Sequence, residues 1–190
     1  MSKRFDSASK LIQASPSTIY RIFAEPDAMQ AWLPPQGMTG RMLAFEFREG
    51  GAYRLRLTYN DPHHAPGKTS SDADEVDVRF VRLVQDRCIE QAVTFESDDP
   101  AFAGQMRIVW AFEPDEAGTR VTVRCEDVPV GIRPEDHQAG LNSTLDKLAA
   151  YVARIEPMRR PGESERGSCP QNCDESLVKN ATQLLFARLS

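Results

Sequence analysis

Two spacings of hydrophobic residues divide the chain into an early and a late region. Between residues 41 and 127, apolar side chains recur at every second position, as in residues 52–59, where Tyr and Leu alternate with Arg and Thr. This spacing is typical of antiparallel strands that bury one face. From Pro134 to about Ala153 the apolar residues recur at i, i+4, i+7 and i+11, which predicts one amphipathic helix of about 20 residues.

The alternating region separates into six strands at its turn signals. Gly50-Gly51 and the segment 114–118 mark two turns, and residues 60–74 form a longer polar loop. Within residues 75–84 the apolar positions change parity after Phe80, which predicts a β-bulge or a strong bend. The predicted strands are residues 41–48, 52–59, 75–84, 88–96, 105–113 and 119–127.

The first forty residues predict one more strand and two short helices. Residues 8–14 can form the strand, and Ser15-Pro16 starts a helix, because Ser caps a helix well and Pro fits its first turn. Pro26 is expected to end this helix, and Asp27 to cap a second one that carries Trp32.

Composition and charge exclude some classes of function. The chain has 190 residues, enough for one ordinary domain, and a formal net charge of −5 makes a nucleic-acid role unexpected. Arg54 and Arg56, like Arg79 and Arg82, alternate with apolar residues and are expected on solvent faces of strands. No apolar run reaches the ~20 residues that span a bilayer, and the N-terminus does not resemble a signal peptide. We therefore expect a cytosolic chain without membrane insertion and with reduced thiols.

The C-terminal segment differs from the rest in composition. Residues 157–173 are rich in Arg, Glu, Gly, Ser and Pro and predict a disordered linker, whereas residues 174–189 regain helical spacing. That short helix could dock on the sheet, pair with a second copy of the chain, or lie free, so a homodimer stays open. We predict a folded domain at 1–156 and a flexible tail at 157–190. Cys169 and Cys173 in this tail are expected as exposed free thiols, with a reversible disulfide or metal scavenging as the alternatives.

The order of the predicted elements defines a fold class. A single antiparallel sheet has one apolar face that must be covered, and the last helix of the domain is the long element available. We expect an α+β fold in which a curved sheet wraps around this C-terminal helix. Such an arrangement leaves a cavity between sheet and helix, which is a usual place for a ligand.

Several segments carry a family resemblance. Residues 12–23, the segment from Asp27 through Trp32-Leu-Pro-Pro to Gly37, and residues 45–53 with their Arg-Glu-Gly-Gly turn resemble the START-like (SRPBCC, helix-grip) superfamily. Within it, the chain is most similar to the Activator of Hsp90 ATPase homologue-like branch, over about residues 8–155. One departure is that Leu141 follows Gly140, where members of the branch often have Trp.

The resemblance implies a hydrophobic cavity between sheet and C-terminal helix, but no single activity. Our leading hypothesis is the binding of a lipid-like or aromatic small molecule without catalysis. One alternative is a cochaperone-like domain that activates an Hsp90-type ATPase, with a filled interior and a functional surface. Another is a cyclase or dehydratase acting on a polyketide-like substrate, with Tyr or His137 as acid and base.

The expected ligand-binding residues lie on the apolar faces of the strands and of the final helix. Tyr53 and Tyr59 are the best orienting donors, because a buried phenol needs a partner. Asn142 lies one residue from the apolar stripe of the helix. A half-exposed position and a contact with the ligand are equally expected for it. The predicted set is Trp32, Tyr53, Leu57, Tyr59, Phe95, Met106, Ile108, Trp110, Leu141, Asn142 and Leu145.

Other reactive residues have simpler interpretations. Cys88 and Cys125 are expected as small buried hydrophobes in strands, and His63-His64 as part of a solvated loop. His137, in the first turn of the long helix, is expected at the surface, with a role at the pocket mouth as the alternative. No catalytic triad, phosphate loop or dinucleotide motif occurs, so we predict no catalytic residue, no metal and no cofactor.

Overall fold

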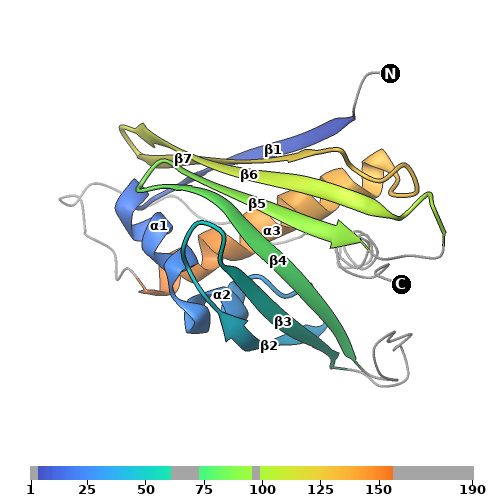
Figure 1. Cartoon of the computed structure of the whole chain (residues 1–190). Coiled ribbons are helices and arrows are strands. Elements are labelled where there is room, and N and C mark those ends of the chain that lie inside the picture. The colour runs from blue at the N-terminus through green and yellow to red at the C-terminus, as the bar shows by residue number, and fades with distance from the viewer. Residues whose placement is uncertain (1–3, 61–72, 96–98, 156–190) are drawn as a thin grey trace.

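A computed structural model describes residues 4–60, 73–95 and 99–155 (Figure 1). The predicted order of elements is confirmed: one strand, two short helices, six strands and a long helix. The elements are β1 (Phe5–Ile12), α1 (Pro16–Ala24), α2 (Pro26–Trp32), β2 (Met38–Phe45), β3 (Ala52–Tyr59), β4 (Ala73–Val84), β5 (Cys88–Phe95), β6 (Gly104–Asp115), β7 (Gly118–Glu126) and α3 (Pro134–Ile155).

The strands form one antiparallel sheet of seven, in the order β1-β7-β6-β5-β4-β3-β2. The first strand joins the sheet beside the last one, and α3 runs along one face of the sheet, next to β1 (Figure 1). Helix α2 contacts α3 and β2, and α1 packs on α2 and β6. The chain therefore has the α+β helix-grip architecture that the sequence predicts.

The helix starts follow the capping chemistry only in part. Ser15 caps α1 as predicted, and its side chain accepts a hydrogen bond from the Thr18 backbone amide at 3.1 Å. The prediction that Asp27 caps α2 is wrong, because Glu25 occupies the cap without a side-chain bond and Pro26 is already helical. Asp27 lies inside the first turn, where a carboxylate interacts favourably with the helix dipole.

Strand register agrees with the pattern of apolar residues. The parity change in β4 is a register shift between Phe80 and Arg82, as predicted, whereas a second shift in β2, between Met42 and Ala44, was not predicted. The hairpin from β6 to β7 closes at Gly118, whose φ is +141°. A Cβ atom there would lie 2.2 Å from the carbonyl oxygen of Ile12, so β1 packs closely on this turn.

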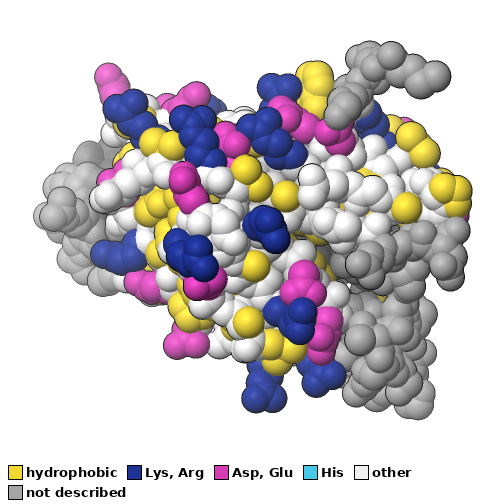
Figure 2. Space-filling view, viewed as in Figure 1, with side chains coloured by type: hydrophobic (Ala, Val, Ile, Leu, Met, Phe, Trp, Pro, Cys, Tyr) yellow, Lys and Arg dark blue, Asp and Glu magenta, His cyan; other side chains and the backbone are white. Residues whose placement is uncertain are grey.

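The outer face of the sheet is charged, as the spacing of its arginines predicts. Arg54 pairs with Asp77 at 2.8 Å, and Arg107 bridges Glu90 and Glu126 on neighbouring strands. Basic and acidic side chains are interspersed over this face in Figure 2. The inner face, in contrast, carries the apolar residues and contacts the helices.

Candidate functional site

The predicted ligand-binding residues mostly gather in one buried cluster between the sheet and the helices. Ile108 is half-buried, and Asn142 is exposed, because the helix turns it about 100° away from Leu141. Asn142 is therefore not brought to the cluster. The buried members are Trp32, Tyr53, Leu57, Tyr59, Phe95, Met106, Trp110, Leu141 and Leu145.

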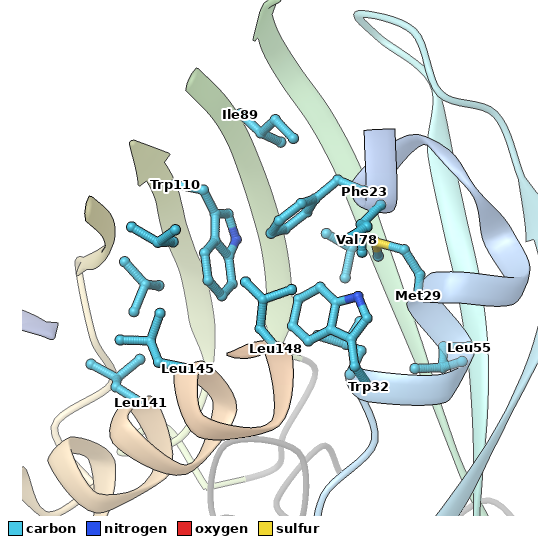
Figure 3. Close-up of a cluster of buried hydrophobic side chains, with 14 of the residues drawn as sticks. Phe23, Met29, Trp32, Leu55, Val78, Ile89, Trp110, Leu141, Leu145 and Leu148 are labelled. Carbon is cyan, nitrogen blue, oxygen red and sulfur yellow. The ribbon is translucent and has the colours of Figure 1, made fainter. Parts of the chain in front are cut away.

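Three aromatic rings from three elements meet at the centre of this cluster (Figure 3). The Phe23 ring of α1 lies 5.1 Å from that of Trp32 in α2 and 5.0 Å from that of Trp110 in β6. All three pairs are edge-on, a favourable geometry for aromatic rings. Phe23 was predicted on the buried face of α1 but not as a site residue.

Two indole nitrogens are buried in this centre, and they differ in their partners. Trp110 Nε1 donates a hydrogen bond to Gln91 Oε1 at 3.2 Å. Trp32 Nε1 is enclosed and has no acceptor among the residues that the structure describes. Gln91 was missed from the sequence, although its inward position in β5 between Ile89 and Val93 is a readable signal.

Tyr53 lies near a second aromatic group at the β2–β4 side of the sheet. Its ring centroid is 5.6 Å from that of Phe80 and 6.5 Å from that of Phe45. Burial raises the pKa of the Tyr53 phenol far above its usual value, so the hydroxyl keeps its proton. Tyr53 can therefore donate a hydrogen bond, as the sequence suggests.

His137 is buried, and the prediction of a surface position is wrong. Its side chain is 0% exposed, and Nδ1 lies 2.7 Å from Asp6 Oδ2, which Arg4 also contacts. Burial lowers the pKa of His137 more than Asp6 raises it, so the neutral ring donates from Nδ1. The prediction failed because β1 starts at Phe5, three residues before the predicted strand, and so places Asp6 beneath α3.

Lys147 of α3 is a half-buried cation that the sequence analysis did not single out. Its Nζ donates a hydrogen bond to the carbonyl oxygen of Pro34, in the segment that follows α2. Burial lowers its pKa to about 8. The signal in the sequence is weak, because a lysine beside the apolar stripe of a helix is ordinarily solvated.

A groove of about 560 Å³ opens on the outer face of the sheet, opposite α3. Its lining is mostly polar and includes Glu75, Asp77, Arg79, Thr94 and Gln105. Because the apolar cluster lies on the other side of the strands, this groove differs from the cavity that the sequence predicts. The groove does not carry the predicted hydrophobic lining.

The cysteines and the remaining histidines add little to the site. Cys125 is buried, as predicted, and burial raises the pKa of its thiol to about 12, while Cys88 is half-buried. His63-His64, the cysteines at 169 and 173 and the tail lie outside the described residues. Among the residues placed by the structure, no three His, Cys, Asp or Glu side chains are grouped to hold a metal ion. The helices in this described part lack the sustained hydrophobic stretch that a bilayer-spanning helix requires.

Comparison with known proteins identifies the family. The family model described as Activator of Hsp90 ATPase homolog 1-like protein matches residues 13–153. The chain belongs to this AHSA1-like family. The resemblance seen in the sequence is thereby confirmed, whereas no curated protein matches the chain.

Solved structures share the AHSA1-like fold. A protein from Chromobacterium violaceum is 28% identical, covers 78% of this chain and 96% of its own, and has a TM-score of 0.66. An AHSA1-like protein from Aeromonas hydrophila is 17% identical and covers 83% of this chain and 99% of its own, with a TM-score of 0.64. A protein from Arthrobacter aurescens is 14% identical, with coverages of 87% and 99% and a TM-score of 0.65.

Proposed function

We propose that this AHSA1-like chain binds a hydrophobic small molecule, lipid-like or aromatic, between the sheet and α3. The observation that carries the proposal is the enclosed Trp32 Nε1–H, which has no acceptor among the described residues. A buried donor without a partner costs about 1–3 kcal/mol. An acceptor atom on a bound molecule would offset that cost.

The surroundings of Trp32 suit an apolar body with few polar atoms. Phe23, Met29 and Leu148 approach its ring (Figure 3), and Gln91, which bonds to Trp110, adds a polar group beside the aromatic centre. Ligand pockets commonly combine an apolar lining with a few such groups. Since side chains fill the centre, a ligand must displace some of them, and Met29 is the most adaptable of these.

Native mass spectrometry before and after organic extraction tests this proposal. A bound mass that extraction removes, and that returns when the extract is added back, is the expected result. Trp32→Phe should weaken rebinding, since it keeps an aromatic ring but removes the N–H. Trp110→Phe is the matched control, because the Trp110 N–H is already satisfied by Gln91. An apo mass throughout, with no uptake of hydrophobic probes, would count against small-molecule binding.

The second candidate is an interaction domain of the cochaperone kind that the family description names. It is supported by the closely packed aromatic centre and by exposed apolar side chains, among which Val130 is 81% exposed. The test is the ATPase rate of an Hsp90-type chaperone with and without the protein. Stimulation that Val130→Asp abolishes would favour this candidate, and no change in rate would remove it.

The cyclase or dehydratase alternative has less support. His137, its predicted acid or base, is held by Asp6 at Nδ1, and its Nε2 is enclosed by protein. A substrate would need that nitrogen within hydrogen-bonding reach. A cytosolic location and a homodimer stay predictions, which cell fractionation and light scattering can check.

A further inference from the structure

Lys147 places a positive charge at the junction of α2 and α3. Its Nζ donates to the carbonyl oxygen of Pro34, two residues beyond the end of α2. Among the described residues no carboxylate pairs with it, and burial is the cause of its lowered pKa. An ammonium group that is withdrawn from water without a counter-ion is costly, so this position calls for an explanation.

A second lysine, which reaches α3 from the neighbouring strand, has an ordinary counter-ion. Lys10 of β1 pairs with Asp146 of α3 at 2.8 Å, and both side chains are exposed. Asp146 precedes Lys147 in the sequence, but successive helical residues point about 100° apart. The nearest carboxylate along the chain is therefore turned toward β1 and away from the Pro34 junction.

The junction lies at the rim of the buried cluster. Leu148 follows Lys147 and points toward Trp32 inside the cluster (Figure 3). Pro34 is buried, and β2 approaches it closely on the other side, because a Cβ atom on Gly40 would lie 2.5 Å from Pro34 Cγ. The Lys147 ammonium thus bonds to the carbonyl of a buried residue beside the apolar interior.

We propose that Lys147 binds the carboxylate of a hydrophobic acid whose apolar body lies in the cluster between the sheet and α3. An ammonium group has three N–H donors, and Pro34 takes one of them, which leaves two for a carboxylate. The charge-assisted bonds would supply the missing counter-ion at the rim. This inference rests on the proposed function and specifies its ligand class as acids over their neutral esters.

The test compares matched acids and esters. Dodecanoic acid and its methyl ester, and 2-naphthoic acid and its methyl ester, are titrated into the full chain at neutral pH. The chain has two tryptophans, Trp32 and Trp110, and both lie in the cluster, so their fluorescence reports occupancy. At least one acid should bind the wild type about tenfold more tightly than its ester, which corresponds to ~1.4 kcal/mol.

Two variants locate the effect. Lys147→Met should lose the preference for the acid and retain the affinity for the ester, whereas Lys10→Met, which removes the exposed lysine, should keep the preference. Equal binding of acid and ester by the wild type, or an undiminished preference in Lys147→Met, would overturn the role of Lys147 and leave the proposed function standing. If neither acids nor esters bind, both proposals fail.

Discussion

The first turn of α3 and its middle differ in how a buried charge is compensated. At its first turn, the carboxylate of Asp6 lies between the Arg4 guanidinium and the His137 ring, so positive and negative groups compensate one another. Farther along, Lys147 meets a carbonyl oxygen and no carboxylate of the described residues. The first arrangement pairs its charges within the protein, although Nε2 of His137 has no partner among the described residues. The second would gain its counter-ion from the acid that we propose as the ligand.

The largest expected effect on stability comes from removing the Asp6 carboxylate, which contacts both Arg4 and His137. Asp6→Ala leaves the Arg4 charge and the His137 ring without their acceptor, and should lower the free energy of unfolding by about 3 kcal/mol. Urea denaturation followed by circular dichroism measures it. Asp6→Asn, which keeps the shape and one acceptor, should cost less. A loss below ~1 kcal/mol for Asp6→Ala would show that the contacts among Arg4, Asp6 and His137 are not needed for stability.

The two tryptophans allow the same comparison between a buried group with a partner and one without, in uncharged side chains. Trp110→Phe removes the donor of a buried hydrogen bond and leaves Gln91 unpaired, so it should cost about 2 kcal/mol. Trp32→Phe removes a donor that has no acceptor among the described residues, and should cost about 1 kcal/mol through lost packing. Both variants are compared by urea denaturation of ligand-free protein. The reverse order would mean that the Trp32 N–H has a partner in solution.

Removing the uncompensated charge should be tolerated or even favourable. Lys147→Met replaces a half-buried ammonium by an apolar side chain of similar length, and should raise the free energy of unfolding of ligand-free protein by up to ~1 kcal/mol. Burial lowers the pKa of Lys147 from 10.5 to about 8 in the folded protein. At a pH between these two values, the unfolded chain keeps a proton on Lys147 that the folded protein has lost. Wild-type stability should therefore rise with pH across that window relative to Lys147→Met, as paired melts at each pH will show.

The smallest expected effect is the pH dependence of stability that arises from His137, in the first turn of α3. Since the pKa of His137 lies below 6.5 in the folded protein, the unfolded chain takes up a proton first as the pH falls. Stability should therefore decline as the pH drops through about 6.5. His137→Gln should flatten this part of the profile. Burial acts to raise the pKa of Asp6, but bonds from Arg4 and His137 outweigh it, and a further loss follows as Asp6 protonates below 3.8.

The fold was predictable because its signals are local. Alternation in β3 and helical spacing in α3 come from residues that are neighbours in the chain, and the Ser15 cap acts on Thr18, three residues away. One error is local and the other is not. The Asp27 cap was displaced by two residues, and β1 began earlier because its partner β7, rather than its own pattern, sets its length.

By itself, the sequence determined which strand faces are apolar and which helix covers them, because a side chain's face follows from its position within its own element. Tertiary structure alone decided which buried polar groups find partners. His137 meets Asp6 across 131 positions of the chain, and Lys147 meets Pro34 across 113. Such meetings depend on how far each strand extends and how α3 lies on the sheet, which no short window of sequence records. The Trp32 N–H, which has no acceptor among the described residues, carries the proposed function, and the Lys147 charge carries the further inference; both are features of the tertiary structure.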